Sequence, residues 1–81
     1  MSAVSLVVEF TIEPFVEGEP GPHVRAAVAA AERSGLSVDF GPFGTSVSGD
    51  DGAVLDAVDG ILRAATAAGA TRVSLQLARA D

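Results

Sequence analysis

The 81-residue chain contains no cysteine, no lysine, no tryptophan and no tyrosine. The absence of cysteine excludes disulfides, thiolate zinc sites and cysteine nucleophiles. Five arginines stand against eleven acidic residues, which gives a formal net charge of −6. Nucleic acids and anionic membranes need a basic surface on their partners. We therefore expect neither as a partner, and the acidity favours cationic or neutral ligands over phosphorylated ones.

Long hydrophobic runs and targeting signals are also lacking. The most apolar stretch near the N-terminus, residues 4–12, includes Glu9 and is too short to span a bilayer. No basic region followed by an apolar core and a cleavage site is present there. The expected location is the cytoplasm.

Side chains for catalysis are equally scarce. His23 is the single histidine, and without cysteine or a second histidine neither an ordinary catalytic triad nor a zinc site can form. Asp50 and Asp51 are adjacent carboxylates, but a helix cap explains them better than acid–base chemistry. No glycine-rich run is followed by a lysine, so a phosphate loop is absent. We expect no enzyme, no metal site and no cofactor, and keep His23 only as a minor ligand contact.

Hydrophobic periodicity predicts four strands and two helices in one domain, residues 1–81. The strands are expected over residues 4–13, 36–40, 45–48 and 72–78. The helices are expected over residues 22–34 and from a cap at Asp50 or Asp51 to a C-terminal cap at Gly69. The order strand–helix–strand–strand–helix–strand predicts a ferredoxin-like α+β sandwich. Its antiparallel sheet would have the strand order 4-1-3-2, with both helices on one face.

Apolar positions predict which side of each element is buried. The expected inward residues are Val24, Ala27, Val28 and Ala31 on the first helix, Val54, Leu55, Val58, Ile61, Leu62 and Ala65 on the second, and Val73, Leu75 and Leu77 on the last strand. That last strand would lie at a sheet edge, where it could pair with its copy in another subunit. We therefore expect self-association to a dimer or a tetramer.

The sheet face away from the helices is expected to be polar. It would collect Glu9, Thr11, Asp39, Ser46, Ser48, Arg72, Ser74 and Gln76. One interpretation is a solvated face, as antiparallel sheets often have, and the other is a hydrogen-bonding floor for a small polar ligand. Glu9 in a central strand has the same two explanations, a cross-strand pair with Arg72 or an acceptor for ligand N–H groups. At one end of the sheet, Phe15, Phe43 and the start of the first helix should cluster.

Three segments carry a resemblance to a known family. They are GLSVDFGPFGTSVSG over residues 35–49, GATRV over residues 69–73 and VEFTIEPF over residues 8–15. Their order and spacing resemble the thiamine- and hydroxymethylpyrimidine-binding YkoF-like family, in its small single-repeat ferredoxin-like members. Where that family often has Glu before the glycine that ends the third strand, this chain has Ser48.

The resemblance implies binding of thiamine or its hydroxymethylpyrimidine moiety without catalysis. Glu9 would accept a hydrogen bond from the aminopyrimidine, and hydroxyl groups would donate or accept around it. Phe43 or Phe15 would stack on a flat ring. The expected ligand-binding residues are Glu9, Thr11, Phe43, Thr45, Ser46 and Ser48. The alternative is a structural or regulatory oligomerisation module without a small-molecule ligand of its own.

Overall fold

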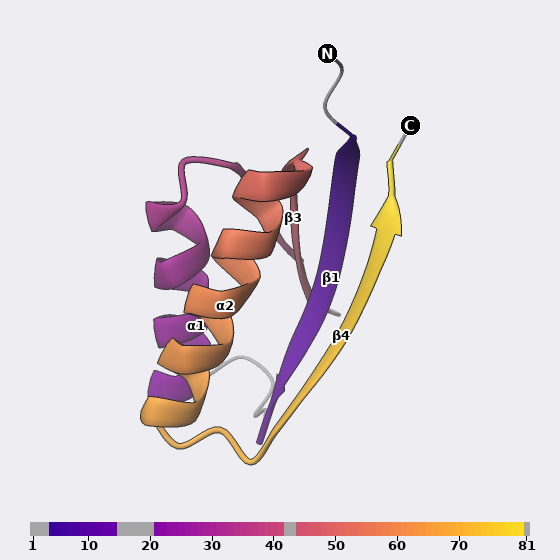
Figure 1. The fold of residues 1–81 in the computed structure, drawn as a ribbon. Coiled ribbons are helices and arrows are strands. Elements are labelled where there is room, and N and C mark those ends of the chain that lie inside the picture. The colour runs from indigo at the N-terminus through magenta and orange to yellow at the C-terminus, as the bar shows by residue number, and fades with distance from the viewer. Residues whose placement is uncertain (1–3, 15–20, 42–43, 81) are drawn as a thin grey trace.

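The computed structural model describes residues 4–14, 21–41 and 44–80. In chain order the elements are β1 (Ser5–Glu13), α1 (Pro22–Arg33), β2 (Ser37–Gly41), β3 (Gly44–Asp50), α2 (Asp51–Ala67) and β4 (Arg72–Arg79). The strands form one antiparallel sheet in the order β2-β3-β1-β4, and both helices cover the same face (Figure 1). The predicted ferredoxin-like α+β fold is confirmed.

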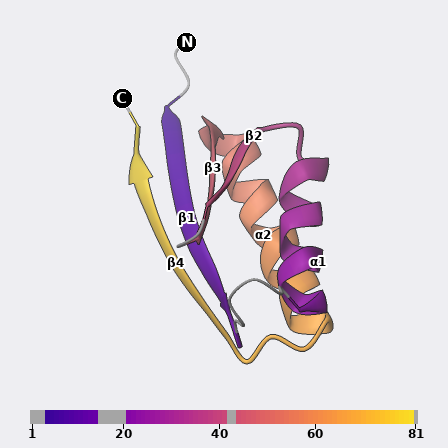
Figure 2. The ribbon, with the colours of Figure 1, turned by 180° about the vertical axis from the view of Figure 1, so that it is seen from behind.

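The sheet has two central strands and two edges. Strands β1 and β3 lie in the centre, whereas β2 and β4 form opposite edges, as the view from behind shows (Figure 2). The loop after α2 joins β4 to the sheet by a hydrogen bond from the Thr71 N–H to the Glu13 carbonyl oxygen at 2.8 Å. This bond sets the point at which β4 begins to pair with β1. No helix in the described ranges is long and apolar enough to cross a membrane.

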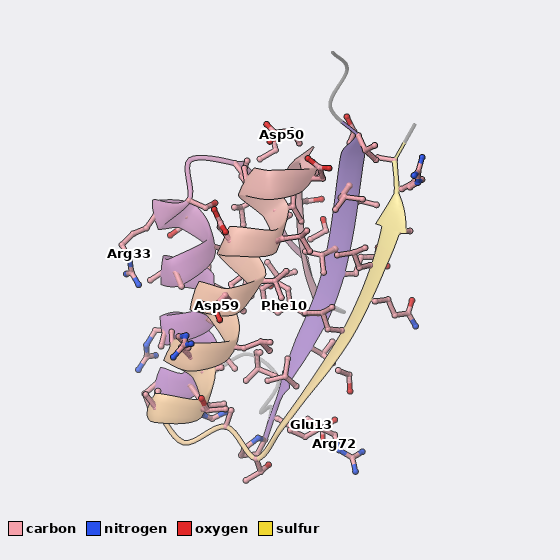
Figure 3. The ribbon with its side chains drawn as sticks, viewed as in Figure 1. Phe10, Glu13, Arg33, Asp50, Asp59 and Arg72 are labelled. Atoms are coloured by element: carbon pink, nitrogen blue, oxygen red, sulfur yellow. The ribbon has the colours of Figure 1, made fainter. Side chains whose placement is uncertain are left out.

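The core lies between the sheet and the two helices. Its buried hydrophobic side chains are Leu6, Val8, Phe10, Ile12, Val24, Ala27, Ala31, Val47, Val54, Ala57, Ile61 and Ala65. Strand β1 supplies every second residue, as its alternation predicted, and Phe10 points from β1 toward the helices (Figure 3). The alanines leave little bulk on the helices, which therefore pack close to the sheet and to each other.

Local chemistry explains where the helices begin and end. Pro22 starts α1, where its missing N–H costs no hydrogen bond. The Asp50 carboxylate caps α2 by accepting a hydrogen bond from the Ala53 N–H at 3.4 Å. Gly35 and Gly69 follow the two helices with φ angles of +76° and +104°, which glycine adopts without steric cost. These features confirm the predicted helix boundaries to within a residue or two.

Two leucines of α2 that were predicted to be buried are exposed. Leu55 is 53% exposed and Leu62 is 37% exposed. Each follows a buried residue by one position, Val54 or Ile61, and so lies about 100° further around the helix. The buried side of α2 is narrower than predicted, and it includes Ala57, which the prediction omitted, three residues after Val54.

Strand β4 is also less covered than predicted. Val73 and Leu75 are partly buried against the core, but Leu77 is 43% exposed. Leu77 lies opposite Val8 of β1, in β4, the edge strand on the side of the sheet away from the two helices (Figure 1). At the other edge, Phe40 of β2 is 52% exposed. The sheet is therefore wider than the two thin helices that cover it.

Candidate functional site

One row of polar residues crosses all four strands on the face away from the helices. Ser46 of β3 pairs with Asp39 of β2 on one side and with Glu9 of β1 on the other. Glu9 in turn pairs with Gln76 of β4. Neighbouring strands lie about 4.8 Å apart, so the row places a carboxylate, a hydroxyl, a second carboxylate and an amide at regular steps.

The row forms part of a hollow of about 420 Å³ in this open face. The described residues that line it are Glu9, Phe10, Thr11, Asp39, Gly41, Gly44, Thr45, Ser46, Ser74 and Gln76. Phe10 and Thr45 are only 3% and 4% exposed, and their side chains point into the core. These two residues therefore line the hollow with their backbone atoms and not with their side chains. The side chains that reach the hollow from the open face therefore end in carboxylate, hydroxyl and amide groups, from Glu9, Thr11, Asp39, Ser46, Ser74 and Gln76.

Two glycines open one end of the hollow. Gly41 of β2 pairs with Gly44 of β3, and Thr11 is the nearest side chain of β1. A Cβ atom at position 44 would lie 3.0 Å from the Phe10 carbonyl oxygen and 3.2 Å from Thr11 Cγ2. Neither glycine contributes a side chain to the floor beside Thr11, so among the described residues a flat group has room to approach the backbone there.

The structure brings together three of the predicted site residues. Glu9, Thr11 and Ser46 all line the hollow from β1 and β3. The side chain of Thr45 is buried on the helix side of β3. Ser48 lies one same-face step further along β3, between Val7 and Ser37, and is not among the described lining residues. Phe43 lies outside the described residues, and so does Phe15, the other ring of the predicted cluster.

Other lining residues were recognised only as part of a polar face. Alternation placed Asp39, Ser74 and Gln76 on the open side, but alternation does not show which side chains are neighbours. The strand register supplies that information: Asp39 and Gln76 share the row of Glu9, and Ser74 lies opposite Thr11. For Gly41 and Gly44 the sequence indicated only a turn, and it did not indicate that they line a site.

The predicted pair between Glu9 and Arg72 is wrong. Arg72 lies opposite Glu13 at the end of β1 (Figure 3), whereas Glu9 lies opposite Gln76. The cause is the turn before β4, which bonds Thr71 to the Glu13 carbonyl oxygen through both its N–H and its hydroxyl. Arg72 is therefore held four residues away from the partner of Glu9, and that carboxylate remains exposed in the hollow.

His23 has a structural partner at the start of α1. Its Nε2 atom donates a hydrogen bond to the carbonyl oxygen of Pro14, which directly follows β1. This contact ties the first turn of α1 to the end of β1. His23 is not among the described residues that line the hollow, so its predicted minor ligand contact gains no support.

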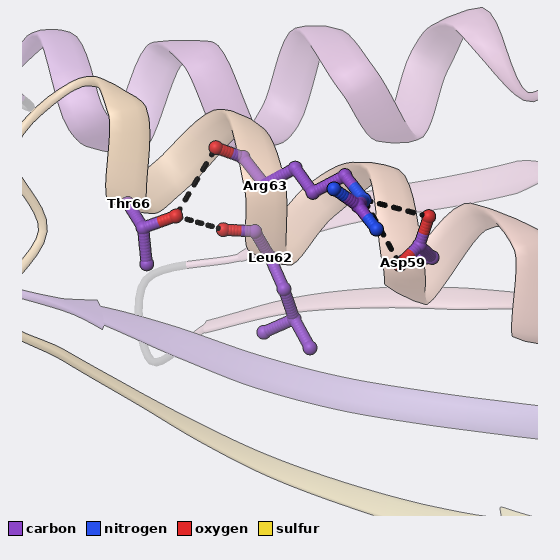
Figure 4. A network of polar contacts seen from close by, with 4 residues as sticks. All are labelled: Asp59, Leu62, Arg63 and Thr66. Carbon is purple, nitrogen blue, oxygen red and sulfur yellow. Dashed lines mark hydrogen bonds and ion pairs between the residues drawn. The ribbon is translucent and has the colours of Figure 1, made fainter.

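The described lining of the hollow is acidic. It includes Glu9 and Asp39 but no arginine, lysine or histidine. An exposed ion pair joins Arg63 Nε to Asp59 at 3.0 Å on α2, away from the open face (Figure 4). In the same figure the Thr66 hydroxyl donates to the Leu62 carbonyl oxygen at 2.8 Å. Among the described residues, no group of three or more acidic or histidine side chains is placed to hold a metal ion.

Solved structures with the same fold come from several organisms. A domain of unknown function, DUF77, from Bacillus cereus is 21% identical, with a TM-score of 0.72 over 98% of this chain and 77% of that one. A protein from Thermotoga maritima, described as a candidate thiamine biosynthesis or salvage protein, is 26% identical, with a TM-score of 0.68 over 93% of this chain and 81% of that one. A protein from Streptococcus pneumoniae is 15% identical, with a TM-score of 0.73 over 95% of this chain and 86% of that one.

Sequence comparison gives a more specific result than the fold. No curated protein matches the chain significantly. The family described as thiamine-binding protein, however, matches residues 8–80, a range that contains all the described residues lining the hollow. The match covers most of the chain and agrees with the resemblance to YkoF-like domains. The chain therefore belongs to the thiamine-binding protein family.

Proposed function

We propose that this protein binds thiamine or its hydroxymethylpyrimidine moiety, without catalysis, in the hollow on the open face of the sheet. The observation that carries the proposal is the row of polar groups at the floor of that hollow, in a chain of the thiamine-binding protein family. The volume of about 420 Å³ falls within the range of about 300–1,000 Å³ usual for small-molecule sites. The Thermotoga maritima protein described for thiamine biosynthesis or salvage supports the same ligand class.

The chemistry of an aminopyrimidine suits these side chains. The ring carries an exocyclic amine, which donates, and ring nitrogens, which accept. Glu9 would accept from the amine, while the hydroxyls of Thr11 and Ser46 would donate to a ring nitrogen. Beside Gly44, which has no side chain, the ligand would lie close to the sheet. The predicted roles of Phe43, as a stacking ring, and of Thr45 and Ser48 belong to the same proposal.

Titration calorimetry tests the binding directly. Thiamine and hydroxymethylpyrimidine are titrated into the wild-type protein, a Glu9→Gln variant and a Glu13→Gln variant. Glu13 is the matched control because it lies on the same strand and the same face but opposite Arg72, outside the described lining of the hollow. We expect Glu9→Gln to weaken binding by about tenfold or more, the loss of a charge-assisted hydrogen bond, while Glu13→Gln binds like wild type. Equal affinities of all three proteins would remove Glu9 from the site.

A second candidate function is that of a structural or regulatory oligomerisation module. It is supported by the exposed apolar residue Leu77 on the edge strand β4 and by Leu55 and Leu62 on α2. We propose that β4 pairs with its copy and gives a dimer or a tetramer. Sedimentation tests the assembly, and thermal unfolding with and without ligand separates the functions. Ligand at about 100 times its dissociation constant adds about 2.7 kcal/mol of stability, so a melting temperature unchanged by millimolar thiamine or hydroxymethylpyrimidine would favour the module.

A further inference from the structure

We propose that Asp39 is a specificity-determining residue, which selects the positively charged thiamine over neutral hydroxymethylpyrimidine and over phosphorylated thiamine. The inference rests on the proposed function and extends it from a ligand family to a ligand charge. In this arrangement Glu9 holds the pyrimidine end through hydrogen bonds. The Asp39 carboxylate faces the other ring of the vitamin, a thiazolium with a permanent positive charge.

The positions of the two carboxylates support this division of roles. Asp39 and Glu9 are both paired with Ser46, from opposite sides, so their backbones lie two strand spacings apart, about 9–10 Å. Both side chains are exposed on the open face and both line the same hollow. A ligand of two linked rings can span this separation, with a hydrogen bond at one end and a charge contact at the other.

The space beside Asp39 is left open for a ring. Gly41 follows two residues later on the same strand and therefore on the same face. Opposite it, Gly44 also lacks a side chain. A thiazolium ring at this end of the hollow would meet no side chain from either glycine, while the pyrimidine remains near Glu9.

The charge distribution on the open face determines whether a positively or a negatively charged ligand is preferred. No basic side chain occurs among the described residues that line the hollow. The one arginine that alternation puts on the open side of the described strands is Arg72, opposite Glu13 and four residues before Gln76. Arg72 is about 13 Å along β4 from Gln76 but only about 7 Å from Ser74, which also lines the hollow, and the Glu13 carboxylate opposite it offsets its charge. A phosphate group would therefore meet two carboxylates without a compensating cation.

The test compares charge-changing variants across three ligands. Thiamine, hydroxymethylpyrimidine and thiamine monophosphate are titrated into wild type, Asp39→Asn, Asp39→Glu and Asp56→Asn, at low and high salt. Asp56→Asn is the matched control because it changes the net charge equally from an exposed position on α2. We expect Asp39→Asn to lower thiamine affinity by about three- to tenfold, as for one partly solvated charge pair, and to leave hydroxymethylpyrimidine affinity unchanged.

Three further results are expected if Asp39 acts through its charge. Thiamine affinity falls with salt in wild type and falls less steeply in Asp39→Asn. Asp39→Glu retains the preference for thiamine, and Asp39→Asn narrows the gap between thiamine and its monophosphate. The proposal is overturned if Asp39→Asn weakens thiamine and hydroxymethylpyrimidine equally, or changes neither. If the wild-type protein binds none of the three ligands, the proposed function itself fails. If it binds them without regard to charge, only the role of Asp39 fails.

Discussion

Gly41 and Gly44 lie opposite each other on β2 and β3, and neither contributes a side chain to the end of the hollow that they line. The two positions are not equivalent. A Cβ atom at position 41 would lie 3.5 Å from the Gly44 carbonyl oxygen, an ordinary contact. A Cβ atom at position 44 would collide with β1. A substitution at Gly41 can therefore test the binding site, whereas a substitution at Gly44 tests the stability of the fold.

Gly41→Leu should fill the hollow without unfolding the protein. We expect thiamine affinity to fall by about tenfold or more, because the new side chain occupies the space beside Thr11, while the melting temperature changes little. Calorimetry and thermal unfolding measure the two effects. The control is Ser37→Leu, on the same strand and face but outside the described lining. Wild-type affinity in Gly41→Leu would show that the ligand lies elsewhere.

Gly44→Ala should destabilise the protein. The φ angle of Gly44 is +154° and a Cβ atom there would lie 3.0 Å from the Phe10 carbonyl oxygen, so we expect a loss of about 1–3 kcal/mol in the free energy of unfolding. Gly60→Ala is the control, since nothing lies within 4 Å of a Cβ atom at this position in α2. It should instead stabilise the helix by about 0.5–1 kcal/mol. Urea unfolding measures both changes, and two shifts of the same sign would contradict the prediction.

Asp50→Ala should remove the cap of α2. The lost bond to the Ala53 N–H and the lost charge at the helix N-terminus should cost about 1 kcal/mol. For a domain of this size, that corresponds to a fall of about 4–8 °C in the melting temperature. Asp56→Ala, at an exposed position within α2, removes the same charge without removing a cap. Equal melting temperatures for the two variants would argue against capping by Asp50.

Ile61→Ala should be among the most destabilising single substitutions. Ile61 has 0% exposure and is one of the largest fully buried side chains, so truncation should cost about 2–5 kcal/mol. Leu55→Ala is the control in the same helix, because Leu55 is 53% exposed and its truncation should cost well under half as much. Urea unfolding at neutral pH gives both values. Similar losses would mean that the exposed side of α2 is buried in solution, as in an oligomer.

The two faces of β1 were predictable from its residues alone. Leu6, Val8, Phe10 and Ile12 alternate with positions that are polar except for Val7, and a strand has only two sides. Helix starts and stops were equally local, because Pro22, Asp50 and Gly69 act on the backbone within one turn. Leu55 and Leu62 could not be placed in this way. Their burial depends on how wide a contact α2 makes with its neighbours, and that width is set by side chains distant in the sequence.

The sequence predicted which face of the sheet carries the candidate site, but not which residues on that face lie next to one another. Residue types and alternation indicated a polar open side that included Glu9, Thr11 and Ser46, and the family resemblance indicated a ligand. The sequence by itself therefore determined the order of elements, the helix caps and the polar character of that face, since each depends on interactions between near neighbours in the chain. The tertiary structure alone decided the register. The register places Glu9 opposite Gln76 rather than Arg72 and puts Asp39 in the same row. It also places Gly41 opposite Gly44 at one end of the hollow. Register depends on how the turns and the packed core align the strands. For β1 with β3 and with β4 the partners are far apart in the chain, and alternation alone does not predict how they align.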